Sequence, residues 1–120
     1  MDTAVWIAQG SLAAAFLAAG GMKLIQSKAR LETGQPWVAD FSQRQIRGIG
    51  LFEVLGAFGL LLPAITDMGN ALTVVAAVGL ALLMLGAATT HVRRREFGNV
   101  VPNIILFALA VFVFMARLTP

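Results

Sequence analysis

Four hydrophobic stretches in the sequence are each long enough to cross a lipid bilayer as a helix. They cover residues 5–22, 46–65, 71–90 and 100–116. A helix rises about 1.5 Å per residue, so about 20 residues cross the roughly 30 Å hydrocarbon core of a membrane. None of the four stretches has the polar face of a helix on the surface of a soluble domain. We therefore predict an all-α fold: an integral membrane antiparallel four-helix bundle, formed by one domain over residues 1–120.

The composition also favours lipid over water as the solvent. Hydrophobic residues make up 58% and charged residues 12% of the 120 residues, whereas soluble domains have about 45–50% apolar and about 25% charged residues. A soluble domain of this size could not bury the excess, because most of its residues lie near its surface. The chain has no cysteine, which excludes disulfide bonds, thiolate catalysis and cysteine-ligated metal within it.

Positive charge is concentrated in the first and third connections between these stretches. Eight of the nine Lys and Arg residues lie in these connections or beside them: Lys23, Lys28, Arg30, Arg44, Arg47, Arg93, Arg94 and Arg95. Cytoplasmic loops of membrane proteins carry such an excess, so we expect both termini outside and read the charge as a topology signal, not a nucleic-acid site. The first stretch has no positive residue before it, which indicates a retained helix and not a cleaved signal.

The first connection is expected to contain an interfacial segment between helices 1 and 2. Residues 36–41 combine Trp37 and Phe41 with polar neighbours, a mixture typical of the headgroup layer. An interfacial anchor and a substrate-gating loop both remain open for this segment. Ser42, followed three residues later by Gln45, predicts a capping box that opens the second long helix.

Small residues indicate which helix faces meet. In lipid, helices associate through close packing of small residues and through interhelical hydrogen bonds. Such residues recur on three stretches: Gly10, Ala14 and Ala18 on the first, Gly56 and Gly59 on the second, and Gly79 and Gly86 on the third. Packing within the bundle and homo-oligomerisation through one of these stripes are both open.

Glu53 is the polar residue that most needs an explanation. It lies seven residues after Ile46, hence ~10 Å along the helix from the cytoplasmic boundary. A charge at that depth is costly and indicates either a paired structural group or a functional site. Lys23 and His91, at the cytoplasmic ends of two other stretches, are the expected partners. Arg47 is six positions from Glu53 and points to a different face of the same helix.

Asn103 enters the fourth stretch from the same side, so the cytoplasmic third of the bundle collects a set of polar residues: Lys23, Glu53, His91, Asn103 and Arg47. One interpretation is a polar clamp that fixes helix order. The other is an inward-opening pocket for a lipid head group, a quinone oxygen or a proton, with His91 as a relay or hydrogen-bond donor. One histidine and one carboxylate are too few ligands for a metal site or haem, so no metal is expected.

At these residues the chain resembles the DoxX / DoxX-like family of small four-helix bacterial membrane proteins. The matching stretches are residues 16–24, 49–63 and 79–91. The resemblance implies a bacterial cytoplasmic (inner) membrane location and an association with quinone-linked oxidation, because the family name derives from a subunit of a thiosulfate:quinone oxidoreductase. Other relatives look like partners in redox-stress complexes or membrane chaperones. Lys23, Glu53 and His91 carry over, whereas the missing cysteines argue against disulfide-generating activity.

Three functions follow as hypotheses. The first is a membrane subunit that holds a quinone or lipid-like ligand beside a redox protein partner, at most one subunit of a quinone-linked oxidoreductase. The second is a non-enzymatic scaffold or assembly factor that docks a partner or anionic membrane lipid through Arg93, Arg94 and Arg95. The third is an oligomer that transports a small solute or a proton. Of these hypotheses, only the first involves a cofactor, a quinone.

Overall fold

The computed structural model describes residues 2–66 and 69–118, and this part of the chain is all helical, without a strand. Its four long helices are α1 (Asp2–Ile25), α3 (Gln43–Ile65), α4 (Ala71–Arg93) and α5 (Phe97–Leu118). Two short helices, α2 (Lys28–Gly34) and the 3-10 helix η1 (Pro36–Asp40), lie between α1 and α3. The all-α prediction is confirmed, and each predicted hydrophobic stretch lies inside one long helix.

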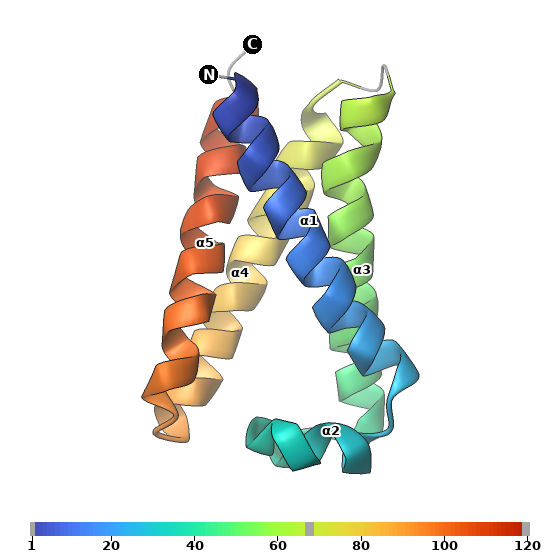
Figure 1. Ribbon diagram of the computed structural model, residues 1–120, viewed down its shortest axis with the longest axis vertical. Helices are drawn as coiled ribbons and strands as arrows, with labels where there is room; N and C mark the ends of the chain where they lie inside the picture. Colours follow the sequence, from blue (N-terminus) through green and yellow to red (C-terminus); the bar gives the residue numbers. More distant parts are fainter. Residues whose placement is uncertain (1, 67–68, 119–120) are drawn as a thin grey trace.

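The long helices form two pairs that diverge toward one end of the molecule. Both termini lie at one end of the long axis and α2 lies at the other, so consecutive long helices run in opposite directions (Figure 1). α1 packs chiefly against α3, and α4 packs chiefly against α5. The two pairs approach each other toward the termini and separate toward α2 (Figure 1).

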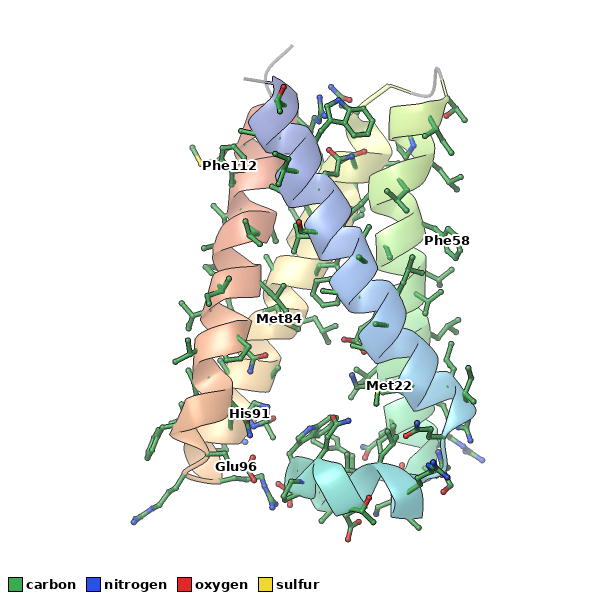
Figure 2. The ribbon with its side chains drawn as sticks, in the orientation of Figure 1. Met22, Phe58, Met84, His91, Glu96 and Phe112 are labelled. Carbon is green, nitrogen blue, oxygen red and sulfur yellow. The ribbon has the colours of Figure 1, made fainter. Side chains whose placement is uncertain are left out.

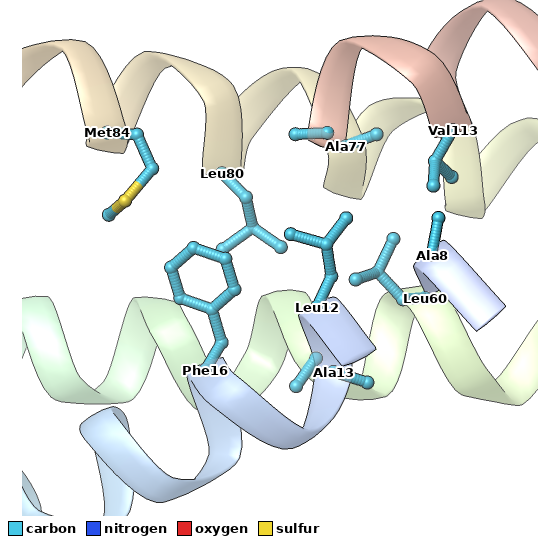
Figure 3. Close-up of a cluster of buried hydrophobic side chains, with 11 residues drawn as sticks. Ala8, Leu12, Ala13, Phe16, Leu60, Ala77, Leu80, Met84 and Val113 are labelled. Atoms are coloured by element: carbon cyan, nitrogen blue, oxygen red, sulfur yellow. The ribbon is translucent and has the colours of Figure 1, made fainter. Parts of the chain in front are cut away.

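One buried apolar cluster joins all four long helices. Leu12 and Phe16 come from α1, Leu60 from α3, Leu80 from α4 and Val113 from α5, and all five are buried (Figure 3). Each such side chain contributes about 1.5–3 kcal/mol when it leaves water, although in lipid the gain comes from close packing. This cluster holds the two helix pairs together on the side of the termini.

α1 and α3 cross in close contact at Gly20 and Gly50. A Cβ on Gly20 would lie 2.7 Å from the carbonyl oxygen of Gly50, and a Cβ on Gly50 would lie 2.7 Å from the Cβ of Lys23. Both distances are far shorter than a normal contact, so glycine is what lets these two backbones approach. Lys23 and Glu53 each follow the glycine of their own helix by about one turn, and each lies beside the glycine of the other helix.

The small residues named from the sequence divide into two groups. A Cβ on the glycines that face a neighbouring helix would meet its side chains at 2.7–2.9 Å: Gly56, Gly59 and Gly79. These positions pack α3 against α4. The stripe on α1 is instead exposed, at Gly10, Ala14 and Ala18, and Gly86 on α4 is exposed with no neighbour near its Cβ position. Packing inside the bundle is therefore the wrong interpretation for the stripe on α1, and its use in homo-oligomerisation stays a prediction.

The first connection folds further than the sequence predicted. Leu31 from α2, Val38 from η1 and Ile46 from α3 form a second buried cluster, against which Trp37 and Phe41 pack. Helix α2 was not predicted, because a helix of seven residues with one large apolar residue, Leu31, has no visible hydrophobic period. The helices α2 and η1 of this connection form a small layer across the end of the molecule below α3 (Figure 1).

The predicted capping box at the start of α3 is confirmed. The backbone N–H of Gln45 donates to Ser42 Oγ at 3.1 Å, and the backbone N–H of Ser42 donates to Gln45 Oε1 at 2.9 Å. These bonds satisfy two donors that a helix start leaves unpaired. They fix where α3 begins after η1.

We expect Gly20→Ala to lower the free energy of unfolding by about 1–3 kcal/mol, because the added methyl group would press on the backbone of Gly50. Gly21→Ala is the matched control, since a Cβ on Gly21 would have nothing within 4 Å and alanine favours a helix. Unfolding by SDS in mixed micelles, followed by circular dichroism, measures both variants. Equal stability of the two would contradict a tight crossing.

Candidate functional site

Lys23 and Glu53 form a buried ion pair between α1 and α3. Lys23 Nζ lies 2.8 Å from Glu53 Oε1, and the two residues are 8% and 3% exposed. Each follows the glycine of its helix by one turn, so the close crossing brings the two charges together. Of the two partners that the sequence left open for Glu53, Lys23 is the one the structure brings into contact. Each of these buried charges needs the other, because one of them alone would be costly to keep away from water.

A cavity of about 570 Å³ lies between the two helix pairs, with the Lys23–Glu53 pair in its wall. Its apolar lining comes from all four long helices and includes Phe16, Ile49, Met84 and Leu106. Its polar lining consists of Lys23, Gln35, Glu53, Thr90, His91, Arg93 and Asn103. Along α1 and α4 the lining changes from apolar to polar toward α2. The cavity is therefore apolar at its end toward the termini and polar at its end toward α2.

Four of the five candidate residues predicted from the sequence line this cavity. Lys23, Glu53, His91 and Asn103 come from four different helices and meet here. Arg47 does not: it is half-buried near the start of α3 and outside the cavity lining. The reason is the one expected from helical spacing, because six residues along a helix place Arg47 and Glu53 on different faces.

Asn103 lines the cavity and carries a hydrogen-bond donor without an acceptor. Its Nδ2 atom is buried and has no hydrogen-bond acceptor within the described part of the chain. A buried donor left without an acceptor costs about 1–3 kcal/mol. An oxygen atom bound in the cavity would relieve that cost.

His91 is held by a network of ionic side chains at the end of α4. Its Nδ1 atom lies 2.9 Å from Glu96 Oε1, and Arg94 Nε donates to Glu96 Oε2, also at 2.9 Å. Figure 2 shows His91 and Glu96 near the end of α4 and α5 that faces α2. The hydrogen bonds from His91 and then from Arg94 hold the pKa of Glu96 below its ordinary value. Glu96 is therefore a carboxylate that accepts from both neighbours.

Arg94 also ties the first connection to this network. Its Nη1 atom donates to Asp40 Oδ1 of η1 at 2.8 Å. The two helix pairs diverge at this end (Figure 1), so the bond links η1, which packs on the α1–α3 side, to the end of α4. Of the three arginines predicted to dock a partner, Arg94 is thus engaged within the chain, while Arg93 and Arg95 are exposed.

Trp37 belongs to the site, although the sequence predicted only an interfacial position for it. Its ring lies 6.3 Å from the ring of His91, edge to face, and Lys23 Nζ is 5.7 Å from its centroid. Trp37 Nε1 donates to Gln35 Oε1 at 3.2 Å. The segment expected in the headgroup layer therefore also forms a wall of the cavity. The sequence contained one indication of this role: Trp37 lies between Lys23 and Glu53 along the chain.

Thr89 and Thr90, near the end of α4, do not bond the other polar residues of the site. Their hydroxyl groups donate to the carbonyl oxygens of Leu85 and Gly86, four residues earlier on α4. Thr90 still lines the cavity. Within residues 2–66 and 69–118, no group of three His, Cys, Asp or Glu residues is placed to hold a metal ion.

A comparison with known protein families identifies the family of this chain. A model of the DoxX-like family matches residues 7–113, which include most of every long helix and all the residues of the cavity. The chain belongs to the DoxX-like family. The resemblance seen in the sequence is thereby confirmed. No curated protein and no solved structure shows significant similarity to it.

In this DoxX-like protein a second polar cluster lies at the end with the termini. Gln9 is 1% exposed; its amide donates to the carbonyl oxygen of Leu60 and accepts from Arg117 Nε at 3.1 Å. The guanidinium of Arg117 also lies 5.6 Å from the ring of Trp6. Gln9 lies near the start of α1 and Arg117 near the end of α5, so the two residues meet at the same end of the molecule. The cluster joins α1 to α3 and α5 where the two pairs meet.

We expect Lys23→Met to lower the free energy of unfolding by about 3 kcal/mol or more, because it leaves the Glu53 carboxylate buried without its partner. The double variant Lys23→Met/Glu53→Gln should recover most of that loss, since neither charge then remains. SDS unfolding in mixed micelles measures both. Glu32→Gln, on the exposed surface of α2, is the control and should change stability by less than about 0.5 kcal/mol. Losses that simply add in the double variant would contradict the pairing.

Proposed function

We propose that this DoxX-like protein is a four-span integral membrane protein of the bacterial cytoplasmic membrane. Each long helix is long and apolar enough to cross a membrane. Each also turns large apolar side chains outward: Ile7 on α1, Leu55 on α3, Val75 on α4 and Ile105 on α5 are between 55% and 67% exposed. Lipid chains would cover such surfaces, whereas water would not.

The distribution of charge supports the end with α2 as the cytoplasmic one. All the Lys and Arg residues of the first connection, and Arg93 to Arg95, lie toward that end, opposite Arg117. Positive residues are retained on the cytoplasmic side during insertion. Both termini would then lie outside, as the sequence predicts.

Single cysteines test this orientation cleanly, because the chain has no cysteine of its own. We expect Thr3→Cys to react with a membrane-impermeant maleimide in intact cells. Arg95→Cys, in the turn between α4 and α5, should react only after the membrane is opened. Both positions are exposed, so burial does not explain a difference. Labelling of Arg95→Cys in intact cells would reverse the proposed topology.

We infer that the cavity binds an amphipathic, lipid-like molecule with an oxygen-bearing head group, of which a quinone is the leading example. The observation that carries this inference is the unpaired Asn103 Nδ2 donor in the polar half of the cavity. The volume of about 570 Å³ lies within the range of small-molecule pockets, about 300–1,000 Å³. The head group would face Asn103, His91 and Lys23, and the tail would lie along Phe16 and Met84.

A quinone-binding subunit would work beside a redox protein partner, and the exposed side chains of Arg93 and Arg95 suit a partner with an acidic surface. Co-purification from cells, with and without substitution of both arginines by Gln, tests that part of the proposal. If the cavity bound no ligand, a scaffold without chemistry of its own would be the better interpretation. The same two arginines would then form its docking surface.

Decylubiquinone, a quinone with a short tail, is a suitable probe for the cavity. We expect saturable binding of about one molecule per chain in lipid nanodiscs, measured by extraction of the bound quinone. Asn103→Leu should weaken binding about fivefold, because it removes one hydrogen bond worth about 1 kcal/mol at nearly the same volume. Arg47→Gln, outside the cavity lining, is the control and should bind as the unmodified protein does. Binding that never saturates would reject the proposed ligand class.

A further inference from the structure

The hydrogen-bonding state of the His91 ring follows from its neighbours. Glu96 accepts from Arg94 through Oε2 and lies 2.9 Å from His91 Nδ1 through Oε1. A carboxylate has no hydrogen to donate, so the hydrogen of this second contact must be on Nδ1. In the neutral imidazole, the other ring nitrogen, Nε2, then carries a lone pair and can only accept.

The polar end of the cavity consequently combines groups of opposite character. His91 lines the cavity, and with Nδ1 engaged by Glu96 its remaining nitrogen is an acceptor. Asn103 Nδ2 is a donor without a partner. Lys23 Nζ has three hydrogens, and Glu53 Oε1 is the carboxylate oxygen it contacts. A head group that satisfies this set must both donate and accept.

We propose that the cavity selects a head group that bears a hydroxyl, donating that hydrogen to His91 Nε2 while a second oxygen accepts from Asn103 Nδ2. Glu96 is the positioning residue that makes His91 an acceptor. A carbonyl in place of the hydroxyl would set two lone pairs against each other. This inference rests on the proposed ligand-binding function and deepens it, because it assigns the reduced, quinol-type head group, not the quinone, as the preferred ligand.

Decylubiquinol and decylubiquinone test this selectivity, because their head groups differ by two hydrogen atoms. Their dissociation constants would be measured in nanodiscs without oxygen, under identical conditions for the two forms. We expect the quinol to bind about fivefold more tightly or better, the effect of one hydrogen bond of about 1 kcal/mol. Glu96→Gln should bring the ratio of the two constants close to one, since an amide can donate to Nδ1 as well as accept from it. Glu32→Gln, an exposed acid on α2, should keep the ratio of the unmodified protein.

The ratio of the two dissociation constants distinguishes a failure of this proposal from a failure of the proposed ligand-binding function. Equal binding of both forms by the unmodified protein would overturn the hydroxyl preference and leave the ligand-binding function standing. Binding of neither form would reject both. If Glu96→Gln weakened both ligands by the same factor, the role of Glu96 would be structural and the assignment of His91 as an acceptor would fail. His91→Ala adds an independent check, because it should also bring the ratio to one.

Discussion

Where α1 crosses α3, two glycines allow the backbones to meet so closely that Lys23 and Glu53, each one turn after the glycine of its own helix, come within 2.8 Å of each other. The two features depend on each other. Without the glycines the helices would stand apart and leave two buried charges unmatched, and without the charges the crossing would lose its strongest polar contact. The close crossing and the ion pair together hold α1 and α3 as one unit. They also set a polar group in the wall of the space that opens between that unit and the pair α4–α5.

The two ends of the molecule differ because different contacts hold them. Toward the termini, Gln9 links α1 to the backbone of α3 and to Arg117 of α5, and the apolar cluster around Leu12 and Phe16 fills the interior. Toward α2 the helix pairs separate, and the connection between them is made by side chains of η1, above all Asp40 with Arg94. The bundle is thus closed at one end and bridged by ionic bonds at the other, and the cavity of about 570 Å³ lies toward the second end.

The polar end of the cavity is organised by hydrogen bonds that constrain one another. Arg94 binds both Asp40 and Glu96, and Glu96 in turn binds His91. In such a chain each bond orients the next group and strengthens its neighbours. The consequence is a histidine whose orientation and hydrogen position are set by groups that do not line the cavity themselves. Membership of the DoxX-like family is compatible with many ligands, so it is this local chemistry that narrows the choice.

The sequence by itself determined the four apolar helices, the capping box that starts α3 and the need of Glu53 for a partner, because each is a property of neighbouring residues or of composition. Only the tertiary structure decided that Lys23 and not His91 pairs with Glu53, that Glu96 engages His91, and that Trp37 lines the cavity. The pairing of Lys23 with Glu53 and the position of Trp37 join residues on different elements, and they depend on how closely and at what angle the helices cross. The contact of Glu96 with His91 depends instead on the backbone path of the turn after α4. A hydrophobic pattern along one helix carries no information about either geometry.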